Sequence, residues 1–486
     1  MSQDLNANRP AWAIQGFLEI KNNHLAIGGV DAHELIEAYQ SPLYVFSEQR
    51  IRHNIERLKR AETALGGLPL KVCYAAKANS NMAILRAVRE AGADIETNSG
   101  GELFKALKIG FRPDQIIFNG TSKTEDEHAD AIRAGIYAIQ ADSFFEVEQI
   151  ERVARRLNKP ANVSLRLVPE IETDTMHGLQ TAMLTSKFGM LSNEVFECFQ
   201  RFGKSEFVRL KGIHLHLGSQ TPDAAPFAEA FLKLFKVLKE IYEETGIRLE
   251  HLNLGGGFPT NYALDDANLL GLPAERRNLF AADLEPAEVL AAAMHVVRKV
   301  AEQSDALNLL DNLTILLEPG RSVIADAGIL LTTVRNIKSR PLMQTEAEIQ
   351  NPESRIQNDD WLLTDAGYNL MLSMNNYKWY YHLISASRAT EEHETPYKLA
   401  GPLCDGGDVY FDIEGTRRLP DYRLLPESVQ PGEVLALLNV GAYSYAQMFP
   451  YNGRPLPAAV LIGENGSVEL IRKADTYETL IESDVW

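Results

Sequence analysis

KVCYAAK at residues 71–77 is the first of eight short apolar runs that alternate with helical patterns as far as Pro319. The other seven runs are ADIET (93–97), IIFN (116–119), AIQA (138–141), VSLRLV (163–168), LKGIHLHL (210–217), LEHLNL (249–254) and LTILLE (313–318). Each has the length of a buried strand. Residues 222–242 repeat apolar side chains at helical spacing. Eight such strand–helix units predict an α/β fold, a (β/α)8 barrel, with an open doubly wound sheet as the competing topology.

The sequence on both sides of this repeat has a different character. Polar stretches at 341–360 and 388–398 read as loops, and short apolar runs with turn residues between them follow. The segment FLEIKNNHLAIGGV (17–30) predicts a hairpin that turns at Asn22-Asn23. We therefore expect the barrel over residues 44–320. A β domain of sandwich or Greek-key type is expected from residues 1–43 together with 321–486.

Composition narrows the possible partners and surroundings of the chain. Its 486 residues carry a net charge of -18, which disfavours nucleic acid or an anionic membrane as a partner. The three cysteines, Cys73, Cys198 and Cys404, form no CxxC pair, so a reducing cytoplasmic setting is expected. The N-terminus lacks a secretory pattern, and no apolar run is long enough to cross a membrane.

Four chemical groups follow the predicted strands at the barrel end where active sites lie. Lys77 follows the first strand, and His214 and His216 end the sixth. Three glycines (255–257) follow the seventh, and Glu-Pro-Gly-Arg (318–321) follows the eighth. Taken singly, each has a structural explanation: a lysine at the barrel rim, buried core histidines, a tight turn and a buried ion pair.

Together these groups match what pyridoxal phosphate requires. The cofactor's aldehyde needs an amine, its ring needs a flat partner, its phosphate needs backbone amides, and its pyridine nitrogen needs a carboxylate. Lys77, the histidines, the glycines and Glu318 supply them in that order. The sequence therefore predicts a pyridoxal-phosphate enzyme.

Longer motifs point to a particular family. They are YAAKAN (74–79), SGGEL (99–103), SKFG (186–189), HLHLGSQ (214–220) and EPGRS (318–322). With them the chain resembles the fold-type III pyridoxal-phosphate decarboxylases, which include diaminopimelate and ornithine decarboxylases. The resemblance implies an alanine-racemase-like barrel, a C-terminal β domain and a homodimer with shared active sites.

The resemblance also implies residue roles. Lys77 would bind the cofactor covalently, His216 would stack on its ring and Glu318 would pair with its pyridine nitrogen. The phosphate would be held by Ser219, Gly255, Gly256, Gly257, Gly320, Arg321 and Tyr443, the last from the GAY motif at 441–443. The segment GPLCDGGD (401–408) resembles the one that the partner subunit inserts, and its Cys404 would protonate Cα. Lys77, Cys404, His216 and Glu318 are the expected catalytic residues.

The residues at the substrate-binding positions resemble two different branches of the family. Cys404-Asp405-Gly406 stands where the diaminopimelate branch has Cys-Glu-Ser, and Ser373 stands where that branch has an arginine for a distal carboxylate. Asp365 and Asp405 match the aspartates that hold the distal ammonium in ornithine decarboxylase. The expected substrate-binding residues are Arg321, Asp365, Tyr377, Asp405 and Tyr443.

The predicted function is α-decarboxylation of a (di)amino acid by a carboxy-lyase similar to diaminopimelate decarboxylase. Ornithine, lysine, arginine or an amino acid of a siderophore or antibiotic pathway are alternative substrates. A racemase of this type would place an arginine where Glu318 stands. A non-catalytic cofactor-binding protein would lack the second domain, and a metal enzyme would need a third ligand beside His214 and His216, so no metal is expected.

Overall fold

The computed structural model describes residues 10–171, 175, 186–341 and 358–486. Most of the loop expected at 341–360 lies outside these residues. The chain divides into two compact units. The first, here the β-rich unit, contains residues 1–50, 261–281 and 325–486, and the second, the barrel unit, contains 51–260 and 282–324. Residues 261–281, within the range expected for the barrel, therefore belong to the β-rich unit.

The barrel unit contains a closed barrel of eight parallel strands, which confirms the predicted fold and excludes the open sheet. The strands are β5 (Leu70–Ala75), β6 (Asp94–Thr97), β7 (Ile116–Phe118), β8 (Ala138–Ala141), β9 (Ala161–Arg166), β10 (Val208–His214), β11 (His251–Asn253) and β12 (Thr314–Leu317). Each overlaps one of the eight apolar runs. β12 pairs with β5 and so closes the barrel.

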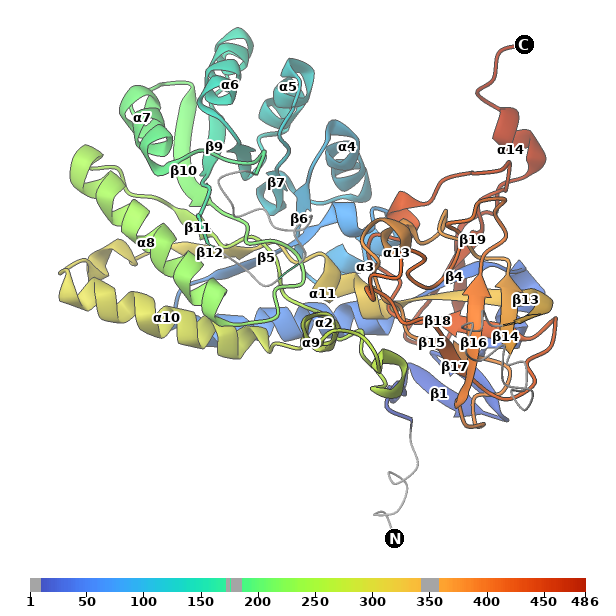
Figure 1. Ribbon diagram of the computed structural model, residues 1–486. Helices are drawn as coiled ribbons and strands as arrows, with labels where there is room; N and C mark the ends of the chain where they lie inside the picture. Colours follow the sequence, from blue (N-terminus) through green and yellow to red (C-terminus); the bar gives the residue numbers. More distant parts are fainter. Residues whose placement is uncertain (1–9, 172–174, 176–185, 342–357) are drawn as a thin grey trace. The chain divides into compact units, whose positions relative to one another are not determined.

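Helices surround these strands (Figure 1). They are α2 (Glu48–Arg60), α3 (Met82–Glu90), α4 (Gly100–Ile109), α5 (Glu125–Ala134), α6 (Phe144–Leu157), α7 (Ser192–Phe202), α8 (Ala225–Thr245), α10 (Pro286–Gln303) and α11 (Arg321–Ile324). The helix expected from residue 222 begins at Ala225, because Pro226 fits the first turn, where no intrahelical N–H is needed. Ser99, Thr124 and Ser143 cap α4, α5 and α6 with their side chains.

The β-rich unit is built on a mixed sheet of nine strands. They are β4 (Leu43–Ser47), β13 (Gly328–Pro341), β14 (Asn358–Thr364), β15 (Leu383–Ser385), β16 (Thr395–Ala400), β17 (Arg423–Leu425), β18 (Val434–Leu437), β19 (Ala458–Ile462) and β20 (Val468–Arg472). β4, from the N-terminal segment, lies between β13 and β19, so segments from both ends of the chain build the sheet, although all but the first residue of β4 fall in the range expected for the barrel.

Smaller elements complete this unit. They are β1 (Leu18–Lys21), β2 (His24–Ile27), β3 (Val30–Asp31), α1 (Ala32–Tyr39), α9 (Ala274–Ala281), α13 (Leu372–Asn376) and α14 (Tyr477–Ile481). The predicted hairpin is confirmed: β1 pairs with β2, and Asn22 and Asn23 turn the chain with φ of 51° and 70°. Two successive positive φ values suit the right-handed twist of a two-residue hairpin.

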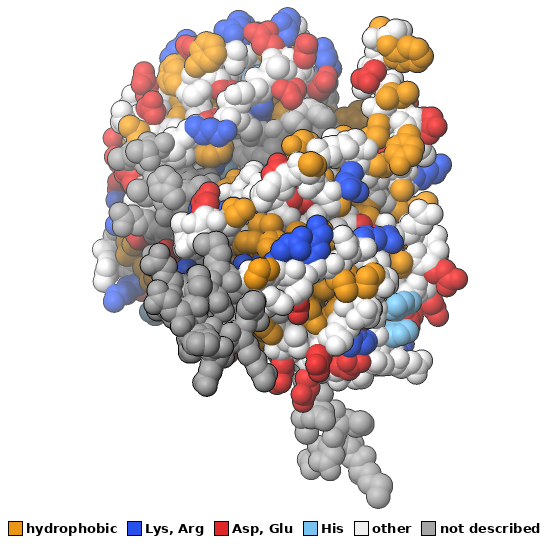
Figure 2. Space-filling view, turned by 45° about the vertical axis from the view of Figure 1, so that its right-hand side comes forward, with side chains coloured by type: hydrophobic (Ala, Val, Ile, Leu, Met, Phe, Trp, Pro, Cys, Tyr) orange, Lys and Arg blue, Asp and Glu red, His pale blue; other side chains and the backbone are white. Residues whose placement is uncertain are grey.

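The molecular surface mixes charges of both signs. On the face that Figure 2 shows, lysine and arginine side chains lie among acidic ones. Among the described residues, no helix is long and apolar enough to cross a membrane.

Candidate active site

Polar side chains gather at the carboxyl ends of the barrel strands. They are Lys77 after β5, Glu96 in β6, Asn119 after β7, Arg166 in β9, His214 in β10, Asn253 in β11 and Glu318 after β12. The Ala75 N–H donates to the Pro319 carbonyl at 2.9 Å, which joins the end of β5 to the turn after β12. Lys77 and Glu318 are thereby brought to neighbouring positions on the same rim of the barrel.

Glu318 is the centre of a buried hydrogen-bond network. Its Oε1 accepts from Asn253 Nδ2 at 2.7 Å, and both of its oxygens accept from Asn119 Nδ2, at 3.0 and 3.1 Å. The His214 Nε2 atom lies 3.3 Å from Oε2. Side chains from three other strands therefore fix the orientation of this carboxylate before any ligand binds.

A second carboxylate, Glu96, joins the same network. It is fully buried, and its Oε1 accepts from Asn119 Nδ2 at 2.8 Å, so one amide nitrogen bridges two acids. Burial raises the pKa of Glu96, and the nearby Glu318 charge raises it further. Burial alone would also raise the pKa of Glu318, but His214 and the Lys77 charge outweigh it and hold this pKa below the ordinary value. The network thus contains one ionised acid, Glu318, and one acid that retains its proton more readily, Glu96.

The two histidines of the sixth strand differ in their contacts. His214 is buried, and burial lowers its pKa although the Glu318 carboxylate opposes this. The His216 Nδ1 atom accepts the Gly256 N–H at 3.0 Å. Burial, followed by the Lys77 charge, holds the pKa of His216 well below the ordinary value. His216 is therefore a neutral ring whose orientation is set by the backbone, as a stacking partner requires.

The glycine turn after β11 has little room for side chains. A Cβ on Gly256 would lie 2.4 Å from the Glu318 carbonyl oxygen, and Gly255 and Gly257 have φ of 66° and 109°. Asn253 Oδ1 accepts the Gly255 N–H at 2.9 Å, and His216 accepts that of Gly256. The Gly257 N–H forms no hydrogen bond with any described residue, so it is the amide of this turn that remains open to a ligand.

The polar groups near the predicted phosphate-binding residues are of two kinds: some bond to one another, and others lack a protein partner. Arg321 Nε donates to Ser219 Oγ at 3.1 Å, which joins the turns after β10 and β12. Among the described residues, Thr221 Oγ1 and Ser322 Oγ are buried without a hydrogen bond. Buried hydroxyls of this kind are uncommon unless a ligand or water completes them. Unpaired donors next to Gly257 and Arg321 fit a phosphate group.

Arg166 is fixed beside this network. Its guanidinium stacks on the ring of Phe188 at 4.2 Å, and its Nη1 lies 3.7 Å from Asp142 Oδ1. The same Asp142 oxygen accepts the Gly189 N–H at 3.0 Å. Phe188 and Gly189 belong to the SKFG motif, so this motif serves to hold the end of β9.

The remaining predicted residues lie in the β-rich unit. Cys404 and Asp405 are exposed, and Asp405 Oδ2 accepts the Tyr368 hydroxyl at 2.9 Å. A backbone hydrogen bond from Gly407, followed by the bond from Tyr368, lowers the pKa of Asp405. Tyr443 has φ of 58°, a conformation that side chains with a Cβ rarely adopt.

Two further residues predicted to bind the substrate, Asp365 and Tyr377, are less exposed than Cys404 and Asp405. Asp365 Oδ1 accepts from the hydroxyls of Ser41 and Thr332 and from the Thr333 N–H, at 3.0, 2.8 and 3.0 Å. Its Oδ2 lies 2.8 Å from Arg335 Nη2. This carboxylate is consequently occupied within the β-rich unit. Tyr377 is half-buried at the end of α13.

Comparison with known proteins identifies the family of this arrangement. Residues 51–325 match the family model of the pyridoxal-dependent decarboxylase, pyridoxal binding domain. The chain belongs to the pyridoxal-dependent decarboxylases. The cofactor of this decarboxylase is accordingly pyridoxal phosphate, and the open Gly257 amide, the buried hydroxyls and the Glu318 network fit that cofactor.

Relatives and solved structures extend the likeness over the whole chain. Diaminopimelate decarboxylase of Methanocaldococcus jannaschii is 34% identical over 96% of this chain and 96% of its own length. The diaminopimelate decarboxylase of Aquifex aeolicus is 32% identical over 96% of this chain and 97% of its own length. The crystal structure of the M. jannaschii enzyme with L-lysine superposes with a TM-score of 0.79 at 32% identity, covering 97% of this chain and 98% of that one. The predicted reaction type, amino-acid decarboxylation by a carboxy-lyase, is confirmed.

Four of the polar residues at these strand ends were not predicted from the sequence: Glu96, Asn119, Arg166 and Asn253. All four lie within or at the end of the quoted apolar runs ADIET, IIFN, VSLRLV and LEHLNL. A polar residue that ends a buried strand of a barrel was the available signal.

Proposed function

We propose that this decarboxylase acts on a diamino acid whose distal group is an ammonium, such as lysine or ornithine. Ser373, at the position of the arginine in the diaminopimelate branch, carries this proposal. Its hydroxyl lies 3.3 Å from both the Tyr443 carbonyl and Gln447 Oε1, and it cannot form a bidentate pair with a carboxylate. The exposed Asp405 carboxylate, with its lowered pKa, suits a distal ammonium instead.

The proposed roles of the residues follow from their surroundings. Pyridoxal phosphate, when bound, withdraws electrons from the carbon that loses its carboxylate. Lys77 provides the amine that attaches the cofactor. The ionised Glu318 holds a proton at the pyridine nitrogen, and the neutral His216 ring supports one face. Ser219, Gly257, Gly320, Arg321 and Tyr443 hold the phosphate, and the Cys404 thiol delivers the proton to Cα.

A homodimer is part of the proposal, because Cys404 and Asp405 lie in the β-rich unit and would be supplied by the partner subunit. The exposure of both side chains supports a role in an interface. We further propose a cytoplasmic location, supported by three cysteines that are all free thiols.

A second candidate substrate is meso-diaminopimelate. The relatives that match over almost the whole chain, at 32% and 34% identity, are named diaminopimelate decarboxylases.

Carbon dioxide release over a panel of substrates decides between the two. The proposal expects kcat/KM for lysine or ornithine to exceed that for meso-diaminopimelate. Asp405→Asn should raise KM for the preferred diamino acid about tenfold or more, because a charge-assisted hydrogen bond is lost. The exposed Asp421→Asn is the matched control and should leave KM unchanged. Activity on meso-diaminopimelate alone would overturn the proposal.

The role of Lys77 is tested separately. Lys77→Ala should remove both the absorbance of lysine-bound cofactor and measurable turnover. Lys108→Ala, at an exposed lysine of α4, should change neither. Normal turnover by the Lys77 variant would contradict the assignment.

A further inference from the structure

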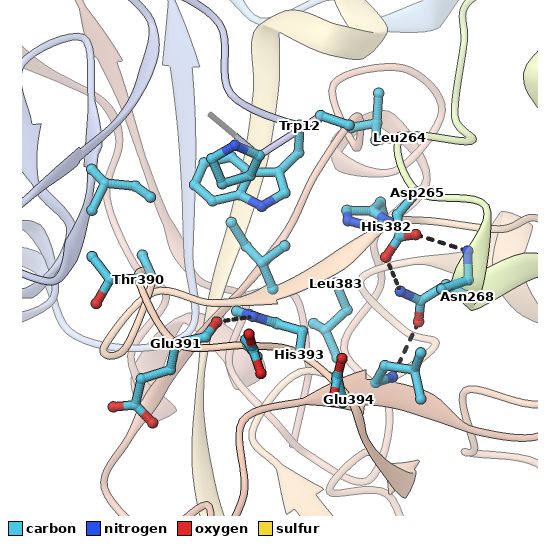
Figure 3. Close-up of a pocket in the computed structure, with 18 residues that line it drawn as sticks. Trp12, Leu264, Asp265, Asn268, His382, Leu383, Thr390, Glu391, His393 and Glu394 are labelled. Atoms are coloured by element: carbon cyan, nitrogen blue, oxygen red, sulfur yellow. Dashed lines mark hydrogen bonds between the residues drawn. The ribbon is translucent and has the colours of Figure 1, made fainter. Parts of the chain in front are cut away.

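A cavity of about 700 Å³ lies within the β-rich unit (Figure 3). Three chain segments form most of its lining: 10–12, 264–268 and 382–394. None of these segments contains a residue assigned to the cofactor or the substrate. The volume is within the range of natural small-molecule sites.

The cavity carries negative charge. Of the described residues that line it, four are acidic (Asp265, Glu391, Glu392 and Glu394) and none is lysine or arginine. Its histidines add no positive charge, because burial lowers the pKa of His382 to about 4 and also lowers that of His393. Since Glu391 is paired with Arg388 at 3.0 Å, the other three acids are those available to a ligand.

Two buried side chains of the lining have an unused polar atom. Trp12 is 5% exposed and His382 2% exposed. The Tyr380 hydroxyl lies 3.0 Å from His382 Nδ1, but His382 Nε2 and the Trp12 indole nitrogen form no hydrogen bond with the residues that the structure describes. Neither atom is among the fully buried unpaired atoms of the described residues, so both are accessible to a ligand or to water although their side chains are buried.

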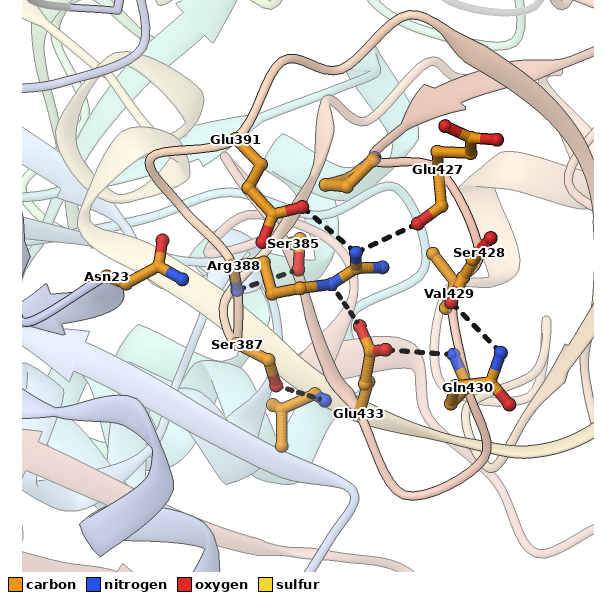
Figure 4. Close-up of polar contacts among 12 residues, drawn as sticks. Asn23, Ser385, Ser387, Arg388, Glu391, Glu427, Ser428, Val429, Gln430 and Glu433 are labelled. Atoms are coloured by element: carbon orange, nitrogen blue, oxygen red, sulfur yellow. Dashed lines mark hydrogen bonds and ion pairs between the residues drawn. The ribbon is translucent and has the colours of Figure 1, made fainter.

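The wall that carries the glutamates is held in place. Arg388 donates to Glu433 Oε2 at 3.0 Å, to Glu391 Oε2 at 3.0 Å and to the Glu427 carbonyl at 2.8 Å (Figure 4). The Thr390 N–H donates to Asn23 Oδ1 at 3.0 Å. A pre-formed wall lowers the entropy cost of ligand binding.

We propose that this cavity binds a small aliphatic primary amine. Asp265 would accept its ammonium together with Glu394, while its methylene chain would lie on Leu264, Leu383 and Ile384. Asp265 already accepts from the Ala267 N–H at 2.8 Å and from Asn268 Nδ2 at 3.1 Å, so its carboxylate is oriented and keeps free lone pairs. Where the ligand has a carboxylate, as a basic amino acid does, the indole N–H of Trp12 would donate to it.

Amines of this chemistry have two sources, a basic amino acid and a diamine without a carboxylate. The inference goes beyond the proposed reaction and does not depend on which amino acid is decarboxylated. It assigns the β-rich unit a binding site of its own.

Calorimetric titration of the holoenzyme with cadaverine, and separately with lysine, tests the site. Asp265→Asn and, as a second variant, Glu394→Gln should each weaken binding of at least one of these ligands about tenfold or more. Asp266→Asn, an exposed neighbour outside the lining, is the matched control and should bind as the wild type.

Tryptophan fluorescence and turnover complete the test. Ligand should change the fluorescence of the wild type but not that of Trp12→Phe, and Asp265→Asn should keep the kcat of decarboxylation. Binding of lysine alone or of cadaverine alone supports the site and identifies the source. Unchanged affinity in both acid variants, or loss of kcat together with binding, would overturn it.

Discussion

At the scale of single residues, Asn119 has the most consequential position in the site. Its one amide nitrogen donates to Glu318 and to Glu96 and so keeps two buried acids within hydrogen-bond reach of a common donor. The neighbouring acids differ in pKa, raised in Glu96 and lowered in Glu318. A shared donor between unlike acids is a way to fix which of them is ionised.

Replacing Asn119 with alanine removes that shared donor. We expect kcat to fall about 10- to 100-fold, because the carboxylate that faces the cofactor loses orientation and some of its negative charge. The absorbance of bound cofactor should also titrate at a different pH. Asn308→Ala, at an exposed position, provides the control. An unchanged cofactor titration would show that Asn119 does not set the ionisation of Glu318.

Asp408, in the turn that follows Asp405, gives a prediction about pH. Burial raises the pKa of its carboxyl to about 6, although two backbone N–H groups, of Tyr368 and Leu403, donate to it at 2.8 Å each. A folded-state pKa above the unfolded value stabilises the protein at low pH, and this contribution is lost as pH rises through about 6.

As the pH rises from about 4 to about 7, the unfolding free energy of Asp408→Asn should therefore increase by roughly 2–3 kcal/mol relative to that of the wild type. Urea unfolding at several pH values measures this difference. A difference in unfolding free energy that does not change with pH would contradict the assigned ionisation.

At the scale of elements, the glycine turn after β11 is the most demanding connection. Gly256 has an ordinary φ but no room for a Cβ, whereas its two neighbours need positive φ. Gly256→Ala therefore tests the lack of room for a Cβ, separately from any strain of a positive φ. It should lower cofactor occupancy at least about tenfold, since the Glu318 backbone or the His216 ring must move.

Cofactor absorbance per subunit after dialysis measures that occupancy. Gly101→Ala, in α4, is the control, because its Cβ would meet only Ser99 Oγ at 3.7 Å. Full occupancy in Gly256→Ala would show that the turn can adjust.

At the scale of the whole molecule, a homodimer with shared sites predicts complementation. Lys77→Ala and Cys404→Ala should each be inactive or nearly so, because one lacks the attachment amine and the other the proton donor. Mixed and allowed to exchange subunits, they should recover about a quarter of wild-type activity, since half of the dimers then contain one intact site. Failure to recover activity, with exchange verified by mass, would argue against shared sites.

Most of the fold followed from local patterns. The eight apolar runs predicted the barrel because buried parallel strands are continuously apolar, and Asn22-Asn23 predicted a hairpin because both residues tolerate positive φ. The place of residues 261–281 in the β-rich unit was not predictable, because it depends on packing between distant segments. Lys77, His216 and Glu318 were readable from motifs, while Asn119 and Glu96 needed the three-dimensional network.

The central position of β4 has a consequence for how the protein is made. Every residue of β4 is buried, and its partners β13 and β19 lie far toward the C-terminus. During synthesis both edges of this strand remain without their partners while the barrel segments emerge. The barrel unit can then fold first. The sheet of the β-rich unit is completed later, when β19 pairs with β4, the first strand of that sheet along the chain. A chain shortened before β19 therefore leaves one edge of the apolar strand β4 unpaired and exposed to aggregation.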